Sequence, residues 1–145
     1  MSASDALDAS PAVLKAIRSA LIADATLSPL LAGDKVMVRA PSSCPTPYLE
    51  LNLREQDYST ATEDGQDFTV LVNVWHEPPS TTPETALTMT IMGHVRRILH
   101  TAALTLDAPF HSVLTRVQSR VGPFQDPDTS VIHGTVLVRA VVDHA

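Results

Sequence analysis

The sequence predicts an α+β fold, with a single antiparallel β-sheet of about four main strands and two α-helices packed on one face. Two segments carry apolar side chains at helical spacing, and four others alternate apolar and polar side chains at every second position. Each apolar stripe must be buried against another element, so two helices on one face of one sheet are the simplest arrangement. The length of 145 residues suits one domain, which we expect to span residues 1–145, with residues 1–9 flexible.

The first helix is predicted at residues 10–23. Ser10 before Pro11 is typical of a helix start, because a serine can cap the first turn and a proline lacks an N–H that would be unpaired there. The apolar positions share one side of this helix: Val13, Leu14, Ile17, Ala20 and Leu21. A further helical turn is predicted within residues 28–33, followed by a short extended segment at residues 36–38.

The first predicted hairpin joins strands that begin at Tyr48 and Phe68. Its core-facing positions are apolar: Leu49, Leu51, Leu53, Phe68, Val70, Val72 and Val74. The connection at residues 56–66 is acidic and polar, with a turn signal at Asp64-Gly65, so we expect a hairpin with an unusually long arm.

The second helix is predicted to start at Thr82-Pro83 and is followed by a second hairpin. The apolar stripe of the helix comprises Leu87, Ile91, Met92, Val95, Ile98 and Leu99. A turn at residues 122–130 separates the two later strands. Their predicted core positions alternate with polar ones: Val113, Thr115, Val117, Val121, Ile132, Val136, Val138, Ala140 and Val142.

Composition excludes several classes of function. Sixteen acidic and ten basic residues give a net charge of -6, which disfavours a DNA-coating role because nucleic-acid binding depends on phosphate neutralisation. The single Cys44 cannot form an intramolecular disulfide. No apolar run approaches the roughly 20 residues of a membrane helix, and the first ten residues are unlike a signal peptide. We therefore expect a soluble protein without membrane contact.

No catalytic, cofactor-binding or metal-binding residues are predicted. The six histidines form no spacing that holds a metal, and His94 reads as a hydrogen-bonded, semi-buried residue. Cys44 lacks a neighbouring base that would activate it. Asp126 and Asp128 flank a proline and indicate a turn. A small hydrolase that uses Cys44 or a histidine with Asp126 or Asp128 is the alternative from a different class.

The sheet face opposite the helices carries a mixture of arginines and large apolar groups. Two interpretations stay open. The face is either solvated or covered by another copy of the protein, and its mixture of arginines and large apolar groups resembles the composition of protein interfaces. On the second interpretation the subunit interface comprises Leu71, Trp75, Leu114, Arg116, Arg120, Leu137 and Arg139. Polar connections on a rigid scaffold favour contact with other partners, and the residues predicted for this are Tyr58, Glu63, Asp64 and Phe124.

Three segments, at residues 47–51, 68–76 and 126–142, resemble in the same order those of the tail terminators, or tail completion proteins, of long-tailed bacteriophages and gene transfer agents. The resemblance implies a structural virion protein that forms a ring, typically a hexamer, caps the tail tube and provides the head-tail joining surface. Its implied partners are itself, the tail tube protein and a head-side neck or adaptor protein, while DNA passes through without specific binding. The resemblance also implies that the protein assembles in the bacterial cytoplasm and is finally located at the tail-neck junction of the particle. It implies no cofactor.

Three hypotheses therefore remain: a tail terminator ring, another neck or tube component of the same particle, and the small enzyme. The identity of the genes that lie next to the gene for this protein would distinguish the first hypothesis from the second. The positions of Cys44, the histidines and the two aspartates in a structure test the third.

Overall fold

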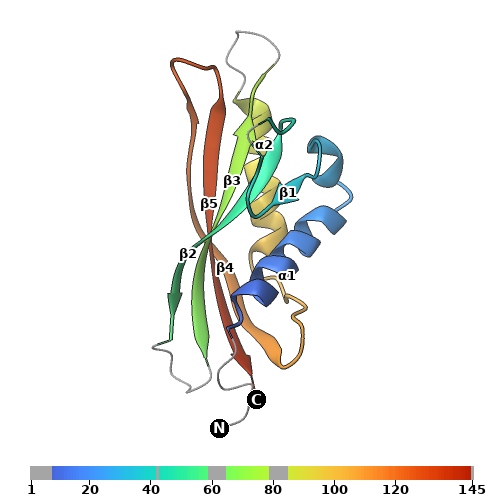
Figure 1. Ribbon diagram of the computed structural model, residues 1–145, viewed down its shortest axis with the longest axis vertical. Helices are drawn as coiled ribbons and strands as arrows, with labels where there is room; N and C mark the ends of the chain where they lie inside the picture. Colours follow the sequence, from blue (N-terminus) through green and yellow to red (C-terminus); the bar gives the residue numbers. More distant parts are fainter. Residues whose placement is uncertain (1–7, 42, 59–64, 79–84, 145) are drawn as a thin grey trace.

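The computed structural model describes residues 8–41, 43–58, 65–78 and 85–144, which form an α+β fold with a single sheet (Figure 1). The fold class is the predicted one. The elements in chain order are α1 (Ser10–Ala23), the short 3-10 helix η2 (Ser28–Leu30), β1 (Val36–Met37), β2 (Tyr48–Asp57), β3 (Gln66–His76), α2 (Ala86–Leu99), β4 (Phe110–Gln125) and β5 (Ile132–His144).

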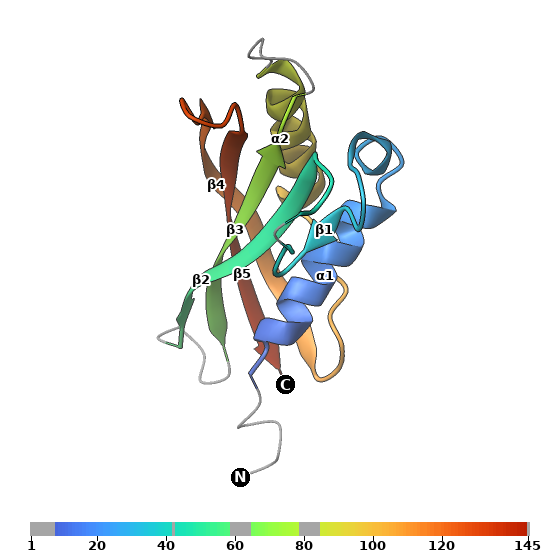
Figure 2. The ribbon, with the colours of Figure 1, turned by 45° about the horizontal axis from the view of Figure 1, so that its top comes forward.

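The sheet has five strands in the order β1-β2-β3-β5-β4. The four long strands pair antiparallel, as predicted, while β1 pairs parallel with β2 and makes the sheet mixed. Both helices lie on the same side of the sheet, with α1 over β1 and β2, and α2 over β3, β5 and β4 (Figures 1 and 2). In the part of the chain that the structure describes, neither helix is long and apolar enough to cross a membrane.

The core lies between the sheet and the two helices. Strands β2, β3 and β5 bury every second residue there, which confirms the predicted alternation, and Phe68 is its largest fully buried side chain. Two residues depart from it: Leu53, near the end of β2, has 37% of its surface exposed, and Asn73 of β3 is buried although it lies on the side away from the helices. Gly134 allows α2 to approach closely, because a Cβ at this position would lie 2.5 Å from the Met92 sulfur.

Strand β4 does not follow the predicted alternation. The pairing of β4 with β5 shifts at three places along the strand, and an extra residue at each shift moves the following side chains to the other face. Val113 and Val121, which were predicted to face the core, are exposed. Gly122 lies at the last shift with a φ of +85°, where a Cβ would meet the His133 carbonyl oxygen at 3.0 Å.

The start of α1 differs in detail from the prediction. Ser10 is the first helical residue and does not cap the helix with its side chain. Ala9 occupies the N-cap position, and Asp8 just before it accepts a 2.9 Å hydrogen bond from the Ser10 N–H through its Oδ1. The predicted start of the second helix at Thr82-Pro83 lies outside the described residues, within which α2 begins at Ala86.

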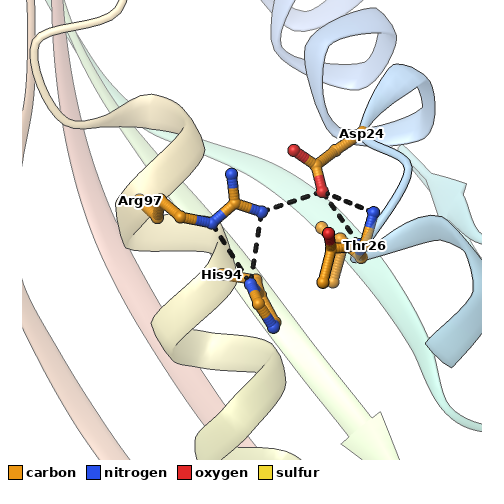
Figure 3. Close-up of polar contacts among 5 residues, drawn as sticks. Asp24, Thr26, His94 and Arg97 are labelled. Carbon is orange, nitrogen blue, oxygen red and sulfur yellow. Dashed lines mark hydrogen bonds and ion pairs between the residues drawn. The ribbon is translucent and has the colours of Figure 1, made fainter.

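A polar contact ties the end of α1 to α2 (Figure 3). Asp24 Oδ1 accepts hydrogen bonds from an Arg97 terminal nitrogen at 2.8 Å and from the N–H groups of Thr26 and Leu27. The Arg97 guanidinium and these N–H groups lower the pKa of Asp24 to about 2. His94 Nδ1 accepts a bond from Arg97 Nε at 3.3 Å, so His94 is hydrogen-bonded at the edge of the apolar stripe, as predicted.

Candidate interaction surface

The sheet face that the helices leave uncovered, which we call the open face, is organised in rows. Residues opposite each other on neighbouring strands carry their side chains on the same side, so the strand pairing defines each row. One row consists of Tyr48, Trp75, His133 and Phe124. A second consists of Asn52, Leu71, Leu137 and Ser119, and a third of Glu55, Thr69, Arg139 and Arg116. Of these three rows, the aromatic one thus lies toward one end of the open face and the one with Glu55, Arg139 and Arg116 toward the other.

The aromatic row forms a rigid platform. The Trp75 and His133 rings stack with centroids 3.9 Å apart and planes 2° apart. Phe124 continues the row on β4, with 60% of its surface exposed. A hollow of about 300 Å³ opens beside these rings and is also lined by Gln125, Asp126 and Val131. Trp75 Nε1 is buried and has no hydrogen-bond partner within the described ranges.

Hydrogen bonds beneath the platform hold His133 in place. Its Nε2 lies 3.2 Å from Asn73 Oδ1, which also accepts a 2.8 Å bond from the Thr135 hydroxyl. Burial lowers the pKa of His133, and the negative charge of Glu50 opposes this shift. A neutral imidazole at physiological pH is therefore favoured, and the ring acts as a stacking partner for Trp75.

The charged end of the open face contains one strong internal ion pair. Arg139 Nε and a terminal nitrogen both donate to the Asp67 carboxylate, the shortest contact being 2.7 Å. This hydrogen bonding raises the pKa of Arg139. Arg116 is its neighbour on β4 and has no ion pair in the described residues. Arg139, predicted as an interface group, is thus already paired within one copy.

Most of the residues predicted for the interface lie on the open face, and one of them, Arg120, does not. Leu71 and Leu137 are direct partners across β3 and β5, and Leu114 lies on the same face opposite Val141. Arg120 does not lie there, because the pairing shift after Val117 places it opposite the buried Val136, on the helix side. Its side chain lines a cleft between β4 and α2.

The predicted interface left out two members of the aromatic row, Tyr48 and His133. Both were assigned to strands, and their alternation pointed them away from the core. Their meeting with Trp75 depends on the pairing of β2 and β5 with β3. The sequence predicted the hairpin of β2 and β3, but no local signal in the chain specifies its register or the pairing of β5 with β3.

The chain matches a family model described as "Tail completion protein gp17" over residues 15–143. The chain belongs to this family. It is also similar in structure to a chain of a particle described as "Virion of native gene transfer agent (GTA) particle", with a TM-score of 0.74 and 19% sequence identity, covering 95% of this chain and 99% of that one. At that identity the likeness shows a shared fold. No curated protein sequence matches the chain.

The residues predicted for partner contact do not form one site in this tail completion protein. Phe124 lies opposite His133 at the aromatic end, whereas the exposed Tyr58 follows the opposite end of β2. Glu63 and Asp64 lie outside the described residues. Any partner that contacts both Tyr58 and Phe124 must therefore span the length of the sheet.

Two of the residues proposed for a hydrolase, Cys44 and Asp126, make local structural contacts in this tail completion protein. Cys44 Sγ contacts the Met37 sulfur at 3.8 Å, and Asp126 Oδ1 accepts a 2.8 Å bond from the Asp128 N–H, which is turn chemistry. The Thr135 hydroxyl lies 3.4 Å from His133 Nε2 and donates a hydrogen bond to the Asn73 side-chain oxygen at 2.8 Å. Among the described residues, no cluster of three metal-binding side chains occurs. Family membership supports a structural component of a particle tail.

Proposed function

We propose that this protein is a tail terminator, a ring-forming protein that caps the tail tube and provides the surface to which the head is joined. Family membership supports a tail component. The open face supports the proposal further. In the part of the chain that the structure describes, the helices of one copy cover one side of its sheet, and the other side keeps an ordered aromatic and aliphatic surface.

A ring, for which we propose six copies, requires two different surfaces on each copy that fit one another head to tail. The open face is suited to one of them. Trp75 and the Leu71–Leu137 pair supply apolar area in its middle and at its aromatic end, while Arg116 lies toward its rim. Leu114 and the paired Arg139 complete the contact, and Arg120 contributes from the adjoining edge.

The proposed partners besides other copies are the tail tube protein on one side and a head-side neck or adaptor protein on the other. Tyr58, Phe124, Glu63 and Asp64 are the proposed contacts. DNA passes through the ring without specific binding, which a chain with a net charge of -6 favours because its field repels phosphates. Assembly would take place in the bacterial cytoplasm, and the finished particle would hold the protein at the tail-neck junction.

Electron microscopy of particles made with and without the protein tests this function. A tube without a terminator keeps adding subunits, so the expected result is headless tails of variable length, restored to uniform length by the wild-type gene. Tails of normal length that fail to join heads would instead indicate a neck component. A complete absence of tails would indicate a tube or initiation component, and normal particles would contradict every version of the proposal.

A further inference from the structure

One edge of the molecule is basic although the chain as a whole is acidic. Helix α2 and strand β4 contain four arginines and neither an aspartate nor a glutamate. Arg97 is held by Asp24, whereas the exposed Arg96, Arg116 and Arg120 form no ion pair within the described residues. These three arginines are the charged groups of the basic edge, which is therefore available for an acidic partner.

A cleft of about 410 Å³ runs between α2 and β4 at the basic edge. Arg96 and Arg120 stand on its two sides, and its apolar lining comprises Met92, Val117 and Val136. Gly93 leaves room there, since a Cβ added to it would meet no atom within 4 Å. An apolar group accompanied by a carboxylate fits this lining better than a phosphate backbone does, because a phosphate has nothing to place on the apolar floor.

The opposite edge of the sheet carries the complementary groups. Strand β1 pairs with only two residues of β2, Leu49 and Glu50, so among the described residues the segment of β2 after them has no strand on the side away from β3. Glu55 is exposed there and forms no ion pair in the described part of the chain. Leu53 is the exposed apolar residue of the same segment, which also contains Arg54 and Asp57.

The strand pairing places these groups at opposite ends of the same rows. On the open face, the row that begins with Glu55 ends with Arg116. On the helix side, the row that begins with Leu53 passes through Val70 and Val138 and ends with Val117, in the cleft. If a second copy is displaced along these rows, its Glu55 lies next to Arg116 of the first copy and its Leu53 lies next to the apolar cleft of the first copy at the same time. Three antiparallel pairings separate β2 from β4, so the two edge strands also run antiparallel to one another.

We propose that copies contact head to tail through these two edges, with Arg116 of one copy facing Glu55 of the next, and Leu53 of the next copy entering the cleft beside Arg120. This inference rests on the proposed ring and specifies its contact. Opposite charges across an interface set register and direction more than affinity. The charged edges therefore determine which way each copy joins, and the open face supplies contact area next to them.

Charge reversal tests the pairing. Arg116→Glu and Glu55→Arg each place like charges opposite one another, so each variant should self-associate at least about tenfold more weakly than the wild type in sedimentation, and cap fewer tails. The two variants mixed in equal amounts should assemble again, because each then meets an opposite charge on its neighbour. The double variant should assemble alone for the same reason. Arg39→Glu makes the same charge change on an exposed connection and should assemble like the wild type.

Disulfide trapping tests the geometry. Glu55→Cys with Arg116→Cys, in a Cys44→Ala background, should give oxidised chains linked from copy to copy. The two positions in one copy are separated by three strand spacings, roughly 14 Å, whereas bridged Cα atoms lie within about 7 Å of each other, so no bridge can form within one copy. Moving the first cysteine to Thr69, in the next strand of the same row, should abolish linkage.

The outcomes separate this inference from the proposed function. The edge contact is wrong if both single charge-reversal variants assemble normal rings, or if the double-cysteine variant forms rings without disulfide linkage between copies. Either result would leave the terminator proposal standing. A wild-type protein that forms no ring in solution or on tails would overturn both. If Arg116→Glu instead reduces binding to duplex DNA in fluorescence anisotropy while rings form normally, the basic edge is a nucleic-acid surface and the inference is wrong.

Discussion

At the scale of single residues, neighbouring strands place chemically similar side chains in opposite environments. Val136 on β5 is 1% exposed and packs in the core, while Val121 on β4 is exposed although the sequence predicted it to be buried. The difference arises from the pairing shifts along β4 and not from the residue type. A polar substitution should therefore have opposite consequences at the two valines.

Val136→Asp should unfold the protein. A carboxylate at this position would be buried without a partner, which we expect to cost about 4 kcal/mol or more of the free energy of unfolding. Val121→Asp is the matched control and should change that free energy by no more than about 0.5 kcal/mol. Urea denaturation followed by circular dichroism measures both, and equal stability of the two variants would refute the burial pattern.

Cys44→Ala should leave folding and assembly unchanged. The thiol makes one weak contact with the Met37 sulfur and has no described contact with a base. Thermal unfolding and tail capping of the variant should match the wild type. A stably folded Cys44→Ala protein that fails to support particle production would instead favour the enzyme hypothesis.

At the scale of elements, the two helices are joined by polar as well as apolar contacts. The apolar stripe of α2 and the buried side of α1 both face the sheet, as their spacing predicted. The sequence did not indicate that Asp24, just after α1, meets Arg97 on α2, because 73 residues separate them. This contact has a measurable pH dependence.

Asp24→Asn should destabilise the protein at neutral pH, and the difference from the wild type should vanish in acid. The pKa of Asp24 falls from 3.8 to about 2 on folding, so its charged form favours the folded state. That contribution is fully present above pH 3.8 and is lost as the pH falls through about 2. Denaturant unfolding of both proteins at several pH values between 7 and 2 measures this. Arg97→Gln should show the same loss, and a difference between wild type and Asp24→Asn that is as large at pH 2 as at pH 7 would contradict it.

At the scale of the whole molecule, the proposed ring leads to a prediction for Trp75. Trp75→Ala should remain a folded monomer, because the ring lies on the open face and outside the core. Truncating an aromatic anchor of an interface costs about 2 kcal/mol or more, roughly thirtyfold in each contact constant. Sedimentation should show no rings at concentrations where the wild type forms them. Trp75→Phe, which retains a ring to stack on His133, should lose less, and normal rings from Trp75→Ala would show that the open face is not an interface.

The polar arm between β2 and β3 should behave differently from Trp75. Replacing residues 58–65 with a two-residue turn removes Tyr58 and the acidic residues but keeps the paired ends of both strands. We expect self-association to be unchanged and docking to the tail tube to weaken, since partner recognition is usually carried by loops on a rigid scaffold. Imaging of tails assembled with the shortened protein measures docking, and loss of rings from this variant would place the arm in the subunit contact.

The sequence determined the elements because helical and strand periodicities are local, and in α1, β2, β3 and β5 they agree with burial. Its motif order also led to the correct family. The two hairpins, β2 with β3 and β4 with β5, were also predicted. The tertiary structure alone decided that β3 pairs with β5 and which residues lie opposite each other, and hence the aromatic row, the Asp24–Arg97 contact and the side of the sheet on which Arg120 lies. The reason is that strand register and bulges depend on the partner strand: one extra residue in β4 changes the face of every side chain after it, and the alternation of β4 alone carries no trace of that shift.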